Sequence, residues 1–329
     1  MTVQITIIGM GQIGTSVGLA LAEQKELVRR VGHDKELKLS RQAEKMGALD
    51  RVEINLPHSV RDADLVLLAL PVDQIKATLE IIAYDLKEGA VVMDTAPVKE
   101  TVAAWAKELL PEGRYYVGLT PVLNPAYLQT HDFGTEAAHA DLFHSGMLII
   151  VTPPGIPSEA IRLATDLTRL LGAQHLFADP VEVDSLMAAT HLLPLFMAAA
   201  LLNATVDQPG WQEGRRFAGR AYAEVTGPIE LLGEPGAISS AALLTRQNIL
   251  RVIDSLIAEL HTFRTDIQDH NEKALVERLE RARLNRFKWW GQRQAANWRS
   301  GTEAPGDMPT ASETFGRMFG LGRKPKPKS

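Results

Sequence analysis

A glycine-rich loop near the N-terminus constrains the fold of this chain more than any other feature. The loop directly follows a β-branched apolar run at residues 3–8 and precedes an Ala- and Leu-rich helical pattern at residues 15–25. Its residues are Gly9, Met10, Gly11, Gln12, Ile13 and Gly14. A strand, a G-x-G-x-x-G loop and a helix in this order are typical of a βαβ unit that binds a dinucleotide.

The glycines of this loop have separate expected roles. Gly9 permits the tight turn, and Gly11 lets the backbone approach a pyrophosphate. Gly14 lets the helix pack closely on the strand, and the free N–H groups at the helix start face the anion.

An acidic residue completes the nucleotide-binding pattern. Asp34 closes the next predicted strand, residues 27–32, about 20 positions after the last glycine. Its carboxylate would accept hydrogen bonds from the adenosine ribose and repel a 2′-phosphate, which favours NAD over NADP. Three cations, Arg29, Arg30 and Lys35, lie close to it in the sequence.

The first half of the chain alternates strands with helical segments. Unbroken apolar runs at 65–70 and 89–93, followed by 115–117 and 147–151, are typical of strands buried on both faces. We therefore expect an α/β fold with a doubly wound parallel sheet, a Rossmann-type domain over residues 1–178. Ligands bind beyond the carboxyl ends of such strands. The loops there add the cofactor candidates Leu70, Pro71, Val72 and Thr95 and the site candidates Lys99 and Thr120.

The second half is predicted to be all-helical, over residues 179–298. Helical patterns cover residues 181–206, 214–232, 237–270 and 273–297. A helix over 237–270 would be about 50 Å long, at ~1.5 Å per residue, and its apolar stripe exceeds what one small domain covers. We therefore expect a homodimer through this domain. Residues 299–329 are rich in Gly, Pro, Ser and Thr and predict a disordered basic tail.

Composition excludes several classes of protein. A net charge of −5 and a pI near 6.0 argue against a nucleic-acid binder. The absence of cysteine excludes disulfides and thiolate metal sites and fits a cytoplasmic location. The scattered histidines suggest no metal site. The apolar stretch 186–204 has acidic flanks and contains His191 and Pro194, which favours a buried core helix over a membrane span.

A series of motifs in a fixed order resembles the prephenate and arogenate dehydrogenases of tyrosine biosynthesis. After the glycine loop and Asp34, the motifs are Ala63–Val72, Val91–Lys99, Glu136–Phe143 with Val151–Pro153, Asp184–Pro194 and Arg281–Arg286. The resemblance covers roughly residues 3–290. It implies a Rossmann domain, a dimerising helical domain, and oxidative decarboxylation of a small carboxylate substrate, prephenate, with NAD(P).

Several family positions are changed in this chain. Pro97 replaces a serine, Thr120 replaces the histidine of a His-Pro pair, and Ala221-Tyr222 replaces a Thr-Arg pair that binds a substrate carboxylate. Arg220 lies beside that last pair. The segment between Thr120 and Gly134 is also about five residues longer than the family pattern.

The histidine of the family's Ser-His-Leu-Pro motif is retained as His191. The resemblance implies that His191 binds substrate, although a core histidine is the alternative. Lys99 either balances a substrate carboxylate or is a solvated lysine. The predicted catalytic residues are therefore His191, Thr120 and Lys99, and the predicted substrate-binding residues are Arg220, Tyr222 and Pro97.

The changed residues leave three functions open. The first is an NAD-dependent dehydrogenase of the prephenate type, with the family's substrate or an altered one. Without the family histidine, either turnover is slow or the longer segment supplies an imidazole from His131, His139 or His144, for which a surface loop histidine is the alternative. The second is a catalytically weakened relative that binds NAD and a carboxylate as a sensor or partner protein. The third is a reductase or dehydrogenase of another β-hydroxy or imino acid.

Overall fold

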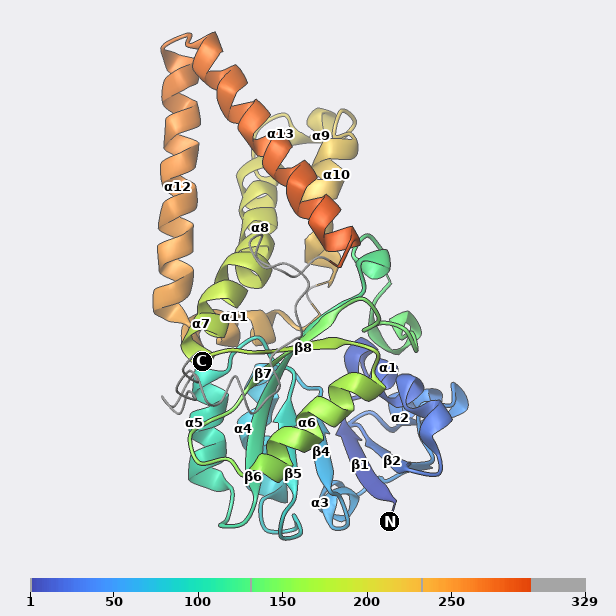
Figure 1. The fold of residues 1–329 in the computed structure, drawn as a ribbon. Helices are drawn as coiled ribbons and strands as arrows, with labels where there is room; N and C mark the ends of the chain where they lie inside the picture. Colours follow the sequence, from blue (N-terminus) through green and yellow to red (C-terminus); the bar gives the residue numbers. More distant parts are fainter. Residues whose placement is uncertain (1, 131, 232, 297–329) are drawn as a thin grey trace, which may run out of the picture. The chain divides into compact units, whose positions relative to one another are not determined.

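An eight-stranded sheet occupies the first half of the chain in the computed structural model, which describes residues 2–130, 132–231 and 233–296 (Figure 1). The strand order is β3-β2-β1-β4-β5-β6-β7-β8. The strands are β1 (Val3–Ile8), β2 (Val28–His33), β3 (Arg51–Val52), β4 (Leu65–Leu68), β5 (Val91–Asp94), β6 (Tyr115–Val122), β7 (Met147–Val151) and β8 (Gln174–Phe177). The expected α/β class is confirmed.

One strand departs from the parallel arrangement that the sequence predicts. β7 pairs antiparallel with β6, with Gly118 opposite Val151 and Val122 opposite Met147. Parallel neighbours need a crossover, usually a helix, to return the chain to the same edge. The segment between these strands contains the short 3₁₀ turns η2 (Pro125–Tyr127) and η3 (Gly134–Ala137) instead, so β7 runs back along β6.

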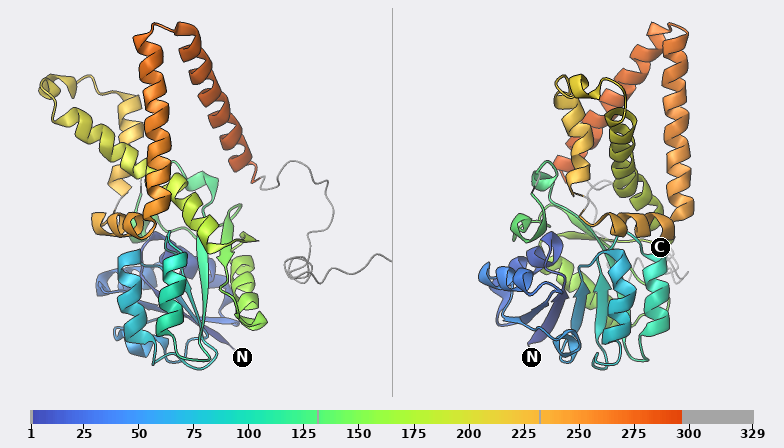
Figure 2. Two further views of the ribbon diagram at one scale, coloured as in Figure 1. Left: turned by 90° about the vertical axis from the view of Figure 1, so that its left-hand side faces the viewer. Right: turned by 180° about the vertical axis from the view of Figure 1, so that it is seen from behind.

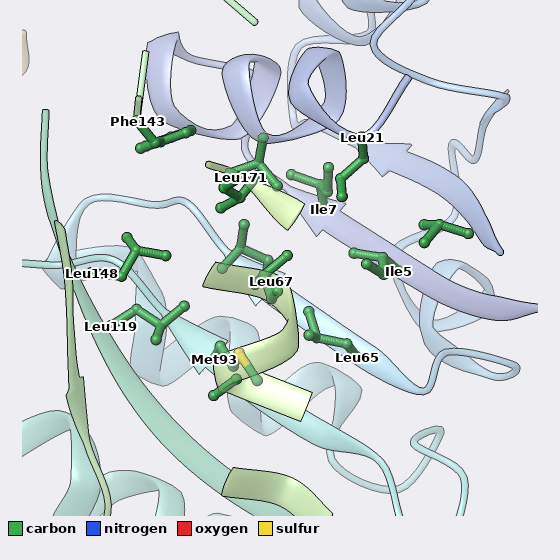
Figure 3. Packing of buried hydrophobic residues seen from close by; sticks show 14 of the residues in the cluster. Ile5, Ile7, Leu21, Leu65, Leu67, Met93, Leu119, Phe143, Leu148 and Leu171 are labelled. Atoms are coloured by element: carbon green, nitrogen blue, oxygen red, sulfur yellow. The ribbon is translucent and has the colours of Figure 1, made fainter. Parts of the chain in front are cut away.

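Helices cover both faces of the sheet. One face packs against α1 (Gln12–Ala20), α2 (Leu37–Lys45) and α6 (Ser158–Leu170). Figure 3 shows this core, in which Ile5 and Ile7 of β1 meet Leu21 and Leu171. The other face packs against α4 (Val72–Ile82), α5 (Glu100–Leu109) and part of the helical region. The short helices η1 (Ala22–Gln24) and α3 (Leu56–Val60) complete this half.

The helical region begins directly after the sheet. Its elements are α7 (Pro180–Met187), the π-helical turn η4 (Ala188–Leu192), α8 (Leu193–Val206), α9 (Trp211–Gly214), α10 (Arg220–Thr226), η5 (Gly227–Leu231), α11 (Pro235–Leu244), α12 (Arg246–Gln268) and α13 (Glu272–Gln294). Residues 1–282 form one compact unit, and a second unit begins at residue 283. Within the first unit, α8, α10 and α12 extend from the end of the sheet where β1, β4 and β5 finish (Figure 2).

The helical segments are more interrupted than the sequence predicts. The expected helix over 214–232 is divided into shorter turns, and the expected helix over 237–270 breaks at Thr245. The continuous helix α12 is 23 residues long, which is about 35 Å. Along it, Ile249 and Val252 are buried, whereas Leu260 and Ile267 are exposed in the single chain. The predicted tail, residues 299–329, lies outside the described residues.

The apolar stretch 186–204 is not the buried core helix that the sequence predicts. Among the described residues, the continuous helical run Pro180–Val206 is long and apolar enough to cross a membrane, with a mean hydropathy of 1.8, and 17% of that window is buried. Ala188, Leu192 and Ala198 are its buried apolar positions after residue 186. Because α8 is apolar on all sides and α10 and η5 pack on one of them, much apolar surface stays uncovered in one chain.

Candidate functional site

The glycine loop has the geometry expected for a phosphate cradle. Gly9 has a φ of +99°, and a Cβ there would lie 2.4 Å from the carbonyl oxygen of Ala69. A Cβ on Gly14 would lie 2.0 Å from the carbonyl oxygen of Gly9. Apart from its chain neighbours, no atom of the described residues lies within 4 Å of the position of a Cβ on Gly11, although that glycine immediately precedes α1. The crowded glycines shape the turn, and the open one leaves room for an anion at the helix start.

Asp34 lies against this loop. Its Oδ2 accepts a 2.7 Å hydrogen bond from the backbone N–H of Met10, and its Oδ1 accepts one of 2.8 Å from Glu36. These bonds hold the carboxylate at the end of β2, beside the loop, where a ribose would lie. Gln12 and Ile13, the other loop candidates, form the start of α1 and are half-buried.

Two of the cations near Asp34 are engaged by other carboxylates. Arg30 is buried and forms an ion pair of 2.6 Å with Asp50. Lys35 is exposed and pairs at 3.2 Å with Glu234, from the segment before α11. In this arrangement both side chains are paired with carboxylates, which favours a nucleotide without a 2′-phosphate.

The segment 134–139 covers the glycine loop, which the sequence did not indicate. The hydroxyl of Thr135 donates to the carbonyl oxygen of Met10, and the amide of Gln12 donates to Ala137 at 3.0 Å. The backbone N–H of His139 donates to Ser16 Oγ at 3.0 Å. The extended connection between β6 and β7 therefore supports the start of α1.

A buried cluster of charges lies at the end of β5. Asp94 accepts hydrogen bonds from Lys99 Nζ at 2.8 Å, from the backbone N–H of Ala96 at 2.9 Å and from the hydroxyl of Tyr116 at 2.5 Å. Asp94 and Lys99 are both fully buried. Burial lowers the pKa of Lys99 and raises that of Tyr116 well above its ordinary value. A Cβ on Gly118 would lie 2.9 Å from Lys99 Cδ, so the absence of a side chain at Gly118 leaves room for the lysine side chain.

This geometry does not match either role expected for Lys99. The ammonium is neither solvated at a helix start nor free to meet a substrate carboxylate, because it is held by Asp94. Lys99 spans the loop that contains Thr95 and Pro97 and ties its two ends together. Thr95 and Pro97 themselves are half-buried, as are Leu70 and Pro71 at the end of β4, whereas Val72 is buried.

Thr120 has a buried hydroxyl. The residue is 3% exposed, and its Oγ1 has no hydrogen-bond partner in the described part of the chain. Side chains alternate along a strand. Thr120 therefore faces the same side of the sheet as Tyr116 and Gly118, toward α4 and α5. Buried polar groups are nearly always hydrogen-bonded, so this exception makes Thr120 a candidate for ligand binding.

His191 lies in the π-helical turn between α7 and α8. Such turns widen a helix by one residue and are frequent at functional sites. The imidazole is accessible in the single chain, and it has no hydrogen-bond partner within the described residues. Surrounding protein partly desolvates the ring and lowers its pKa below the ordinary histidine value, so it is neutral at pH 7.

Arg220 and Tyr222 lie together on α10, which packs against α8 and η5. The exposed guanidinium of Arg220 pairs with Glu224 at 2.6 Å. The hydroxyl of Tyr222 lies 2.8 Å from Thr205 Oγ1, and its ring lines a cavity of about 570 Å³ with Leu202.

Two histidines of the longer segment, His139 and His144, do not face Thr120. His139 stacks on Tyr127 with ring centroids 4.2 Å apart, on the α1 side of the sheet, and His144 lies beside Gly172. His131 lies outside the described residues. Across residues 2–130, 132–231 and 233–296, no three acidic or histidine side chains gather closely enough to hold a metal ion.

The fold and the glycine loop together define a nucleotide-binding oxidoreductase with a helical second domain. Comparison with known families agrees with this assignment. Residues 17–176 match the nucleotide-binding domain of prephenate dehydrogenase, and residues 179–281 match the dimerization domain of prephenate dehydrogenase.

Individual relatives support the same assignment. The chain is 24% identical over 281 residues to a prephenate dehydrogenase of Bacillus subtilis, covering 85% of this chain and 74% of that one. It is 26% identical over 285 residues to a cyclohexadienyl dehydrogenase of Zymomonas mobilis, covering 86% and 94%.

Solved structures share the fold. A prephenate dehydrogenase from A. aeolicus in complex with hydroxyphenyl propionate and NAD⁺ has a TM-score of 0.77 at 19% identity, covering 88% of this chain and 98% of that one. A Synechocystis arogenate dehydrogenase has a TM-score of 0.68 at 20% identity, covering 87% and 99%. This chain belongs to the prephenate dehydrogenase family and is an enzyme of that type.

Proposed function

We propose that this enzyme catalyses the NAD-dependent oxidative decarboxylation of prephenate to 4-hydroxyphenylpyruvate, or of arogenate to tyrosine. Beyond the family assignment, one observation carries the proposal. The hydroxyl of Thr120, buried and without a partner in the described part of the chain, lies on the strand next to β5, at its carboxyl end, where ligands bind in sheets of this kind. The A. aeolicus relative was solved with NAD⁺ and a hydroxyphenyl compound.

The residues at the glycine loop fit NAD. Gly11 offers open space to the pyrophosphate, and Asp34 is fixed beside the loop for the ribose hydroxyls. Leu70–Val72 and Thr95, at the ends of neighbouring strands, would border the nicotinamide. When bound, NAD supplies the hydride acceptor. The engagement of Arg30 and Lys35 by carboxylates supports NAD rather than NADP.

The reaction makes a modest demand on a catalytic base. As the carbinol carbon loses hydride, the bond to the ring carboxylate breaks, carbon dioxide leaves, and the bonding electron pair completes an aromatic ring. The product is a phenol and keeps the hydroxyl proton. Thr120 cannot remove that proton at neutral pH, but its Oγ1 can accept a hydrogen bond from the reacting hydroxyl and orient it. Base assistance is worth roughly a factor of 10²–10⁴, so turnover without it is slow rather than absent.

The remaining predicted residues have unequal support. His191 is accessible and unpartnered within the described residues, and its neutral imidazole can donate to a substrate carboxylate or carbonyl. Pro97 belongs to the loop beside Thr95. Arg220 and Tyr222 stay proposals for carboxylate binding, in which Arg220 would have to exchange Glu224 for substrate. We assign Lys99 to holding the loop rather than to substrate.

We also propose a cytoplasmic homodimer. The match to a dimerization domain and the exposed apolar residues of α8 and α12, among them Met197, Leu260 and Ile267, support an interface between two copies. A buried interface of this kind would cover the apolar window of Pro180–Val206.

A steady-state assay tests the function. Purified protein is mixed with prephenate or arogenate and with NAD or NADP, and both NADH formation and carbon dioxide release are followed. Equal amounts of the two products with one substrate support the proposal. NADH binding without turnover of either substrate would instead favour a sensor, and turnover of another β-hydroxy acid would favour the third function.

A further inference from the structure

The first turn of α5 is capped from another part of the chain. The backbone N–H groups of a helix start have no partner inside the helix, and α5 has no side-chain cap of its own. Asp184, on α7, accepts hydrogen bonds from the N–H of Lys99 at 2.5 Å and from the N–H of Glu100 at 3.1 Å.

The cap is a buried carboxylate. Asp184 is 3% exposed, and burial raises its pKa above the ordinary value for aspartate. A charge at this depth is costly and is retained where hydrogen bonds and a favourable helix dipole stabilise it. The two backbone N–H groups at the positive end of α5 meet both conditions.

Asp184 joins two elements of the candidate site. One is the loop 95–98, which Lys99 and Asp94 hold at its ends and in which the N–H of Thr95 donates to Leu68 at 3.1 Å. The other is the π-helical turn 188–192, which follows α7 directly and contains His191. The carboxylate therefore links α7, which continues into the His191 turn, to the start of α5.

We propose that Asp184 is a positioning residue for catalysis. By capping α5 from α7, it fixes the place of His191 relative to the loop that contains Thr95. The inference rests on the proposed function, since it assigns His191 to the substrate. It differs from a purely structural role because loss of the cap would displace one side of the site while the glycine loop stays intact.

Asp184→Asn tests the proposal with a matched control. Asparagine has nearly the same shape, but its Nδ2 cannot accept from Glu100 or Lys99, so one of the two bonds is lost. Asp179→Asn makes the same change on the same helix, where the carboxylate caps its own helix by accepting from Val181 at 2.9 Å and asparagine caps equally well. Asp184→Ser, which keeps one acceptor and buries no charge, is the second variant if Asp184→Asn does not fold.

Kinetics and a readout without turnover are measured together. For Asp184→Asn we expect kcat/KM for prephenate to fall about tenfold or more, the scale of a lost hydrogen bond to a charged group, while the KM for NAD stays within about twofold. Without substrate, the His191 imidazole resonance, identified by its loss in His191→Gln, should move and titrate at a different pH. Amide exchange should accelerate at residue 99 or residue 100, whichever N–H loses its acceptor. Asp179→Asn should match the wild type in all three.

The outcomes separate this inference from the proposed function. If the wild type turns over neither prephenate nor arogenate, the proposed function fails, and the imidazole resonance still decides the role of Asp184. A folded Asp184→Asn or Asp184→Ser protein with an unmoved His191 resonance would overturn the positioning role. So would an unchanged kcat/KM accompanied only by a lower melting temperature.

Discussion

Replacing Thr120 by valine should change stability and activity in opposite directions. The hydroxyl is buried and has no partner among the described residues, so the folded protein carries its desolvation cost. An unsatisfied buried polar group of this kind costs about 1–3 kcal/mol. Valine has nearly the same shape and no hydroxyl, so the free energy of unfolding of the protein without ligands should rise by about that amount.

The same change should lower activity if the hydroxyl meets substrate. A neutral hydrogen bond contributes about 0.5–1.5 kcal/mol net, which corresponds to a decrease in kcat/KM of about two- to thirteen-fold. NAD affinity should not change, because the glycine loop and Asp34 lie on other strands.

Denaturant unfolding and steady-state kinetics measure both effects, and Thr168→Val is the matched control. Thr168 is also fully buried, but its hydroxyl donates to the carbonyl oxygen of Ala164 at 2.9 Å on α6, on the other face of the sheet. Its replacement should lower stability by about 0.5–1.5 kcal/mol and leave activity unchanged. If Thr120→Val is less stable than the wild type, or equally active, Thr120 is a packing residue and the reasoning is refuted.

Three further predictions follow from the site. Gly11→Ala should fold normally but lose affinity for NADH in a fluorescence titration, whereas Gly14→Ala should lower the melting temperature as well, because its Cβ would meet a carbonyl oxygen. Glu234→Gln should release Lys35 and narrow the preference for NAD over NADP, measured as the ratio of the two kcat/KM values. His191→Asn should weaken substrate binding by about 1.5–3 kcal/mol in calorimetry. Since the folded pKa of His191 is lowered, the wild type should also lose stability as the pH falls below about 6.5, and His191→Asn should lose less.

Much of the nucleotide-binding half is predictable because its signals are local. The buried strands β4 and β5 are uninterrupted apolar runs, and the turn at Gly9 needs a positive φ that glycine readily adopts. The direction of β7 is not local. It depends on whether the connection of 123–146 crosses the sheet, and the residues of β7 fit a parallel or an antiparallel strand equally well.

The helical half was predicted as longer helices than it contains. Within 214–232 the breaks fall at Gly219 and Gly227, which the sequence does mark. Within 237–270, periodicity shows which positions are apolar, but no glycine or proline marks where the helix ends. Thr245, which separates α11 from α12, is a buried residue whose hydroxyl donates to Ala241, a contact that the sequence pattern does not reveal. The exposure of α8 cannot be predicted from the sequence either, because an apolar helix has the same residue pattern whether its own chain or a second copy covers it.

Lys99 shows most clearly why the site was harder to predict than the fold. From sequence, a lysine after a strand end is a cation for an anionic ligand. In the structure Lys99 holds the two ends of the loop after β5 together, because Asp94, five residues earlier, binds its ammonium. A reaction that forms an aromatic ring relaxes the demand for a base, which fits the presence of Thr120. It does not relax the demand for orientation, since hydride moves only between closely aligned atoms. Asp94 fixes Lys99 at the end of β5 and Asp184 caps the start of α5, so we infer that these buried groups serve the orientation of substrate and cofactor.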